Sequence, residues 1–134
     1  WYPGEQGGTA VADILFGKYS PSGRLPVTFY QSLSDLPAYD NYAMKGRTYR
    51  YFNNPVSYPF GYGMSYTQFK WEWYKKPLSR YRMADTLKVE VTVNNTGTLN
   101  GADVLQAYIE YPLAANGPLR EMKAFRKVHV PVQA

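Results

Sequence analysis

The sequence predicts an α+β chain in which a short helix and a long loop precede an incomplete antiparallel β-sandwich. Three observations lead to this fold class. The 134 residues are 45% hydrophobic, enough for a folded core. Aromatic residues make up 17%, which favours strands over helical bundles. Side chains in the second half alternate between apolar and polar with the period of two that strands show.

The first predicted element is a helix from Thr9 to Phe16. The preceding WYPGEQGG contains glycine and proline that favour a tight loop. Thr9 is the expected N-cap, and Gly17 the expected glycine after the last turn. Because this helix is apolar nearly all round, we expect it to need cover from several sides.

An edge strand is expected over 24–30, where Pro26 denies one backbone hydrogen bond to a sheet. Between Gln31 and Tyr66 periodicity fades into a stretch rich in Tyr, Pro, Asn and Gly, which predicts a long ordered loop of functional or linking role. Strands follow at 69–73, 87–94, 104–111 and 122–130, with Val89, Val91, Val104 and Ile109 expected to face inward. An immunoglobulin-type sandwich needs about seven strands, so four leave it incomplete.

Composition excludes several function classes. No cysteine is present, which removes disulfides, thiol catalysis and Cys-based zinc sites. His129 is the only histidine, and we expect no metal and no cofactor. The net charge of +5 comes without any nucleic-acid-binding motif, so a solvated face or an acidic partner domain is the expectation. No apolar run is long enough to cross a membrane. The start at Trp1, within a motif, predicts that the chain is cut from something longer.

Four ordered blocks together resemble glycoside hydrolase family 3. They are WYPGEQGGTAVADILFG with SPSGRLPVTFY, MKGRTYRYF, YPFGYGMSYTQF, and NNTGTLNGADVLQAYIEYP with PLREMKAFRKV. The resemblance implies that 1–64 ends an α/β-sandwich domain with its linker loop, and that 65–134 begins a fibronectin type III-like β-sandwich. DLPAYDNYAMKGRTYRYF is similar to the β-xylosidase branch, with β-glucosidase as the alternative. A non-catalytic carbohydrate-binding or structural module is the alternative from another class.

The resemblance implies a retaining, exo-acting enzyme that removes sugars from the non-reducing ends of plant oligosaccharides, secreted or periplasmic. In that family the nucleophilic Asp lies in an upstream (β/α)8 barrel, and the acid/base Glu in the upstream part of the α/β-sandwich domain. No catalytic residue is therefore assigned to this chain, which we expect to be inactive and to self-associate when isolated. The missing barrel and α/β-sandwich domains are its expected partners.

Four residues are candidates for contact with the oligosaccharide. Arg47, Tyr49 and Arg50 combine planar hydrogen-bond donors with a ring that stacks on sugars. The alternative is an Arg–Asp staple, with Asp35 or Asp40 holding one of the arginines. Glu5 lies in a Gly-rich loop before a helix, where open α/β sheets place ligands. Its alternative role is to stabilise the helix N-terminus.

Overall fold

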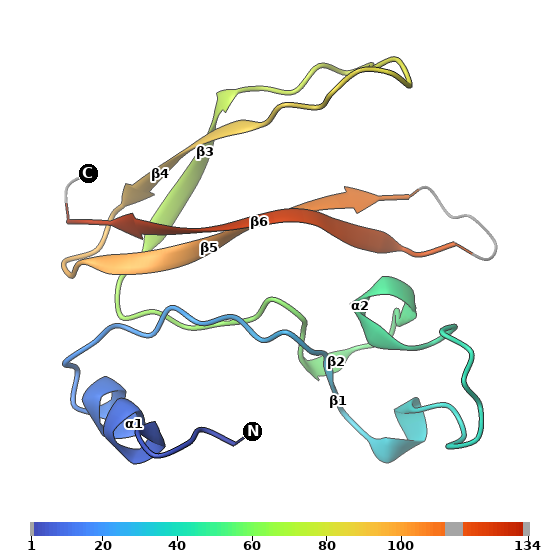
Figure 1. Ribbon diagram of the computed structural model, residues 1–134. Coiled ribbons are helices and arrows are strands. Elements are labelled where there is room, and N and C mark those ends of the chain that lie inside the picture. Colours follow the sequence, from blue (N-terminus) through green and yellow to red (C-terminus); the bar gives the residue numbers. More distant parts are fainter. Residues whose placement is uncertain (1, 112–116, 133–134) are drawn as a thin grey trace. The chain divides into compact units, whose positions relative to one another are not determined.

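The computed structural model describes residues 2–111 and 117–132 (Figure 1). Helical segments are short and confined to the first half of the chain. They are α1 (Gly7–Leu15), the 3-10 turn η1 (Leu33–Asp35) and α2 (Thr48–Tyr51). The strands are β1 (Phe29–Tyr30), β2 (Val56–Tyr58), β3 (Phe69–Lys75), β4 (Glu90–Asn95), β5 (Gly101–Glu110) and β6 (Arg120–Val130). The predicted fold class, a helix and a long connecting segment followed by antiparallel strands, is confirmed.

Two compact units divide the chain, and each combines segments that are far apart in the sequence. The first unit draws on Trp1–Ser20, Ser65–Ala102 and His129–Ala134. The second draws on Pro21–Met64 and Asp103–Val128. The chain passes from the second unit to the first between Met64 and Ser65, which is where the sequence predicts a domain boundary. The assignment of 1–64 and 65–134 to two domains stays a prediction.

Helix α1 of the first unit forms where the sequence predicts a helix, but it begins earlier. It starts at Gly7, so Thr9 lies inside it, and the prediction that Thr9 is the N-cap was wrong. Gln6 precedes the helix and makes no side-chain cap. Gly17 ends the helix with φ +76°, a conformation that glycine adopts without strain. The carboxylate of Asp13, on this apolar helix, forms an ion pair with the ammonium of Lys18 at 3.2 Å.

Strands β3 and β4 pair antiparallel in the first unit, with Trp71 opposite Val93 and Trp73 opposite Val91. The second of these strands is shorter than predicted, because it starts at Glu90. Pro77 follows β3 closely and has no N–H to extend the ladder, so the residues before Glu90 lack a partner strand. Val89 is consequently 42% exposed, and the prediction that it faces inward was wrong.

A buried asparagine organises the polar core of the first unit. The carbonyl oxygen of Asn95 accepts from the hydroxyl of Thr67 at 2.6 Å and from the backbone N–H of Gly97 at 3.1 Å. Its amide nitrogen donates to the carbonyl oxygens of Leu99 at 2.8 Å and Val130 at 3.0 Å. One side chain therefore joins the end of β4, the following turn and the end of β6.

The second unit contains a small antiparallel ladder in place of the predicted strand over 24–30. Only Phe29 and Tyr30 form β1, which pairs irregularly with β2. The backbone of Leu25 extends this pairing. Its N–H donates to the carbonyl oxygen of Tyr62 at 2.8 Å, and its carbonyl oxygen accepts from the N–H of Gly61 at 2.7 Å. Pro26 lies between these two paired regions and explains the gap in the ladder.

The segment over 31–66 is more regular than the predicted loop, since it contains η1, α2 and β2. Each is only three or four residues long, too short to leave a periodic pattern in the sequence. Strands β5 and β6 confirm the predicted strands at 104–111 and 122–130, and run in opposite directions in one two-stranded sheet (Figure 1). Val104 is partly buried, whereas Ile109 is 40% exposed, so the inward position predicted for it was wrong.

No helix among residues 2–111 and 117–132 combines the length and apolar character needed to span a membrane.

Candidate functional site

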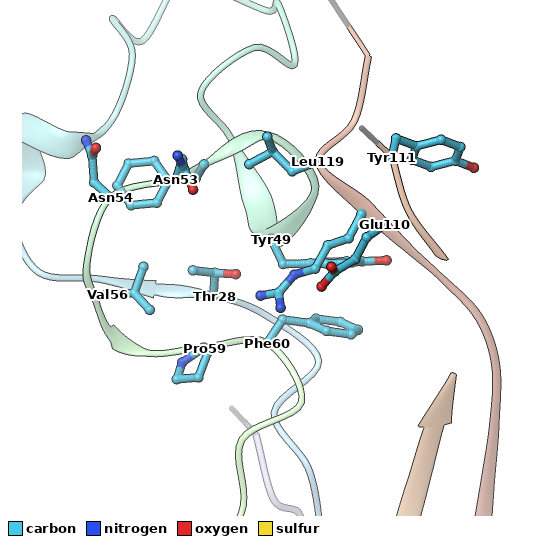
Figure 2. A pocket seen from close by; sticks show the side chains of 12 residues that line it. Thr28, Tyr49, Asn53, Asn54, Val56, Pro59, Phe60, Glu110, Tyr111 and Leu119 are labelled. Atoms are coloured by element: carbon cyan, nitrogen blue, oxygen red, sulfur yellow. The ribbon is translucent and has the colours of Figure 1, made fainter. Parts of the chain in front are cut away.

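A hollow of about 390 Å³ lies within the second unit (Figure 2). Its walls come from the segment around α2 and β2, from the residue before β1, and from the ends of β5 and β6. The lining residues are Thr28, Tyr49, Phe52, Asn53, Asn54, Val56, Pro59, Phe60, Glu110, Tyr111, Leu119 and Arg120. Of the four residues proposed from sequence to contact sugar, one lines this hollow: Tyr49.

Tyr49 is held firmly by three neighbours. Its ring stacks on Phe60 with centroids 4.2 Å apart and an interplanar angle of 18°, and it meets the ring of Tyr108 edge-on at 5.9 Å. Its hydroxyl oxygen accepts from the backbone N–H of Met122 at 3.1 Å. With one ring face covered and the hydroxyl engaged, Tyr49 forms a rigid wall of the hollow.

Arg50 links α2 to the β5–β6 sheet. Its guanidinium forms an ion pair with Glu121 of β6, and its carbonyl oxygen accepts from the backbone N–H of Leu119 at 2.6 Å. Glu121 also accepts from the hydroxyl of Tyr111 at 2.7 Å and from the ammonium of Lys123 at 2.6 Å. Glu121 is therefore the shared acceptor at this junction, a role that the sequence did not reveal.

Arg47 orders its own loop through backbone carbonyls. It donates to the carbonyl oxygens of Asn41 at 2.5 Å, Ala43 at 3.2 Å and Ala38 at 3.4 Å. The staple expected from the sequence therefore exists in part, but the predicted carboxylate acceptors were wrong. Asp35 instead accepts from the backbone N–H of Ser32 at 3.0 Å in a capping box.

Asp40 forms no ion pair with any residue among those described. Glu5 lies exposed in the turn before α1, in the first unit. No hydrogen bond or ion pair of its side chain occurs within the described part of the chain. The structure thus brings Tyr49 and Arg50 together at the junction with β6, while Glu5 belongs to the other compact unit. Contact of Glu5, Arg47, Tyr49 or Arg50 with a sugar stays a prediction.

The polar groups at the hollow were not singled out in the sequence. The hydroxyl of Thr28 is buried and has no hydrogen-bond partner among the described residues. Figure 2 shows the side chains of Thr28 and Glu110 directed into the same hollow, with Asn53 and Asn54 along another side. Thr28 and Glu110 are far apart in the sequence and join only when β5 meets the β1–β2 segment, so no local pattern marks them.

Arg120 and Tyr108 set the electrostatics beside the hollow. The guanidinium of Arg120 lies 5.7 Å from the centroid of the Tyr108 ring, a cation–π contact. Burial raises the pKa of the Tyr108 hydroxyl above its ordinary value, although the positive charge of Arg120 opposes this. The hydroxyl therefore stays protonated at neutral pH and donates to Gln106 at 2.5 Å.

Backbone strain occurs at the start of α2. Thr48 has φ +57°, although β-branched residues rarely adopt this conformation. Its backbone N–H donates to the hydroxyl of Tyr30 at 2.7 Å, and its own hydroxyl accepts from the backbone N–H of Arg50 at 3.3 Å. These two bonds hold the strained turn from which Tyr49 and Arg50 project.

Within the described residues, no three His, Cys, Asp or Glu side chains cluster as metal ligands. His129 lies on β6, within the strand predicted over 122–130, and its side chain is exposed. One carboxylate, that of Glu110, lines the hollow. Retaining glycoside hydrolysis uses two carboxyl groups about 5–5.5 Å apart, so the hollow alone does not present that pair.

Comparison with known proteins identifies the family. Residues 1–66 match the glycosyl hydrolase family 3 C-terminal domain. A xylan 1,4-beta-xylosidase of Xylanibacter ruminicola is 46% identical over 130 residues, which are 97% of this chain and 15% of the relative. The chain belongs to glycosyl hydrolase family 3. A periplasmic beta-glucosidase of Salmonella typhimurium is also similar, with 37% identity over 96% of the chain and 18% of the relative.

Solved structures agree with this family assignment. A β-glucosidase of Erythrobacter marinus is 41% identical and superposes with a TM-score of 0.77. The match covers 100% of this chain and 18% of the β-glucosidase. A β-glucosidase of Listeria innocua, solved with isofagomine, reaches a TM-score of 0.81 at 32% identity, over 100% of this chain and 21% of its own. The chain therefore spans about a fifth or less of the length of these relatives.

Proposed function

We propose that this chain works as part of a longer retaining, exo-acting glycoside hydrolase of the β-xylosidase type. The observation that supports this most directly is the 46% identity to a xylan 1,4-beta-xylosidase across 97% of the chain. The resemblance of residues 35–52 to the β-xylosidase branch supports the same substrate class. Its substrates would be plant-derived oligosaccharides, cleaved at their non-reducing ends.

The alternative activity is that of a β-glucosidase. It is supported by relatives at 36–37% identity and by solved structures whose names state β-glucosidase activity. The two activities differ at one sugar carbon, since xylose lacks the hydroxymethyl group of glucose. A pocket distinguishes such a group by roughly 1–3 kcal/mol, so the ratio of the two activities is the informative measurement.

The catalytic carboxylates belong, in this proposal, to an upstream barrel and an upstream α/β-sandwich segment. The chain described here then acts as a scaffold, in which the α2 turn and the β5–β6 sheet present Tyr49 and Arg50. Arg47 and Glu5 remain proposed substrate contacts. A secreted or periplasmic location is proposed as well, supported by the name of the Salmonella relative, a periplasmic beta-glucosidase.

The test compares the isolated chain with the full-length polypeptide on nitrophenyl β-xyloside and nitrophenyl β-glucoside. We expect the full-length protein to hydrolyse the xyloside with the higher kcat/KM, and the isolated chain to be inactive on both. Turnover by the isolated chain that disappears in Glu5→Gln would contradict the assignment of catalysis to upstream residues. A higher kcat/KM on the glucoside would favour the β-glucosidase.

A non-catalytic structural or carbohydrate-binding role is the second candidate, and the surface of the first unit favours it for the isolated chain. Leu15 and Phe16 of the α1 region are 74% and 90% exposed. Large apolar side chains left in water forgo roughly 1.5–3 kcal/mol each, against a typical domain stability of about 5–15 kcal/mol. The isolated chain should therefore self-associate. Sedimentation that shows a cooperatively melting monomer at micromolar concentration would contradict this.

A further inference from the structure

We propose that a basic arm of the first unit binds the surface of a bilayer that contains anionic phospholipids, without crossing it. The arm comprises residues 74–88, from the end of β3 to the approach to β4. This surface lies outside the residues proposed to contact sugar, so the proposal does not depend on which glycoside the full-length protein hydrolyses.

The arm projects beyond the β3–β4 ladder and is ordered locally. The ladder ends at Lys75, and Figure 1 shows both segments continuing past that point into a turn. The backbone N–H of Leu78 donates to the hydroxyl of Tyr81 at 2.9 Å. The backbone N–H of Arg82 donates to the carboxylate of Asp85 at 2.7 Å. These bonds hold the turn in shape and leave most of its side chains in solvent.

Most of the positive charge of the chain lies on this arm. Its net charge is +4, against +5 for all 134 residues, because the arm contains five basic residues and one acidic residue. The basic residues are Lys75, Lys76, Arg80, Arg82 and Lys88. All five are exposed, and none forms an ion pair with a residue that the structure describes. Because charged side chains are almost never buried without a partner, a molecule that covers the arm must supply negative charge.

Large apolar side chains lie among these charges. Tyr74, Leu78 and Met83 are 76%, 69% and 107% exposed. Such side chains are unfavourable in water, and a partner that offered charge alone would leave them there. A membrane interface accepts both kinds of group, since Lys and Arg contact the headgroups while aromatic and apolar side chains enter the boundary of the acyl chains. The mixed composition of the arm therefore fits a bilayer surface.

Two other partners fit the arm less well. A second copy of this chain would bring the same positive charge against it, and like charges repel. Interfaces between proteins are depleted in lysine, whereas three of the five basic residues of the arm are lysines. Anionic lipid attracts lysine and arginine alike, and clusters of about four to eight such residues are typical of segments that bind it.

The experiment measures cosedimentation of the full-length polypeptide with vesicles of phosphatidylglycerol and phosphatidylcholine in equal parts. We expect binding that weakens as salt rises, because salt screens the headgroup charge, and no binding to vesicles of phosphatidylcholine alone. Replacing both Arg80 and Arg82 by Gln should weaken partitioning about 30-fold, since each basic residue near an anionic surface contributes about fivefold. The matched control, Arg126→Gln with Lys127→Gln, removes the same charge from exposed positions of β6 and should change partitioning less than about threefold.

Met83→Ser separates insertion into the bilayer from attraction by charge. The substitution keeps the net charge and removes a fully exposed apolar side chain. Partitioning should weaken about tenfold while the urea midpoint stays unchanged, because the side chain contributes no packing to the folded state. Leu33→Ser, at a position of η1 that is also exposed, should bind like the wild type.

Several results would overturn the proposal. They are absence of cosedimentation with the anionic vesicles at low salt, equal losses in the two double variants, and unchanged binding in Met83→Ser. Complete displacement of the vesicles by soluble polyaspartate or by inorganic phosphate, at equal concentration of charge, would also contradict it, because the arm would then recognise an acidic protein or a free anion. Nitrophenyl xyloside hydrolysis, measured on the same preparations, reports separately on the proposed catalytic function.

Discussion

Replacing Glu121 by Gln tests whether one carboxylate fastens α2 to the β5–β6 sheet. The change keeps the size of the side chain and removes its charge. In the native chain this carboxylate pairs with Arg50 and accepts from Tyr111 and Lys123. The glutamine retains one acceptor oxygen, but it introduces an amide nitrogen that faces donors.

The expected loss follows from the exposure of the pair. The Glu121 side chain is 17% exposed and that of Arg50 is 38% exposed. Removing one partner of a fully buried pair costs about 3–5 kcal/mol, and an exposed pair contributes about 0–1 kcal/mol. Because solvent screens Arg50 in part, the loss in the free energy of opening the junction should lie between these limits, at about 1.5–3 kcal/mol. Hydrogen bonds to charged groups contribute a similar amount.

Amide hydrogen exchange in the full-length polypeptide measures this loss locally. The N–H groups of Leu119 and Met122 donate to the carbonyl of Arg50 and to the hydroxyl of Tyr49, so they open when the junction opens. The estimate corresponds to exchange about 10- to 150-fold faster in Glu121→Gln. Lys123→Met, which removes only the more exposed partner, should accelerate exchange by less than about fivefold. Exchange in Glu121→Gln within twofold of the wild type would refute the reasoning.

Three further substitutions test other contacts of the two units. Asn95→Ala removes four hydrogen bonds of a buried side chain, so exchange at the end of β4 should accelerate by more than tenfold. Gly61→Ala places a Cβ at φ +82° and against the side chain of Gln106. The free energy of unfolding should therefore fall by about 1–3 kcal/mol, and the urea midpoint should fall with it. Tyr108→Phe should reduce the loss of stability that we expect of the wild type above about pH 10, because burial raises the pKa of this hydroxyl and the folded state holds its proton more tightly.

Matched comparisons show which results contradict these expectations. Thr96→Ser, in the same turn as Asn95, should behave like the wild type. If Gly23→Ala lowers the midpoint as much as Gly61→Ala, the argument from backbone conformation fails, because the added Cβ at Gly23 meets open space. A Tyr108→Phe variant whose midpoint falls between pH 9 and 11 as steeply as that of the wild type would exclude Tyr108 as the titrating group.

The sequence predicts the elements whose patterns are long. The alternation through Phe69, Trp71 and Trp73 identified β3, and the apolar run after Thr9 identified α1. Short elements were missed, because α2 and β2 contain four residues or fewer and their chemistry resembles that of a loop. The alternation predicts a strand from Leu87, but β4 begins at Glu90, because alternation alone does not show that Pro77 follows the end of the opposite strand.

The hollow was less predictable than the fold. The side chains of Arg47, Tyr49 and Arg50 suit sugars, which is why the sequence predicts contact with substrate. In the structure, Arg47 binds backbone carbonyls and Arg50 pairs with Glu121. Thr28 and Glu110 lie in two of the blocks that resemble the family, but no pattern within those blocks indicates that these two residues line one hollow. Their importance arises from pairing between segments that are far apart along the chain, and a single sequence records no such pairing.

The interleaving of the two units has a consequence for how the chain folds during synthesis. The second unit needs Asp103–Val128, and the first needs residues from His129 onward, so both wait for β6. Ribosomes add about 5–20 residues per second, so the roughly forty residues between the halves of the second unit take several seconds to emerge. During that time the early aromatic segments remain unpaired and open to chaperones. A ribosome stall before β6 should therefore leave the emerged part of the second unit, 21–64, open to digestion by proteases.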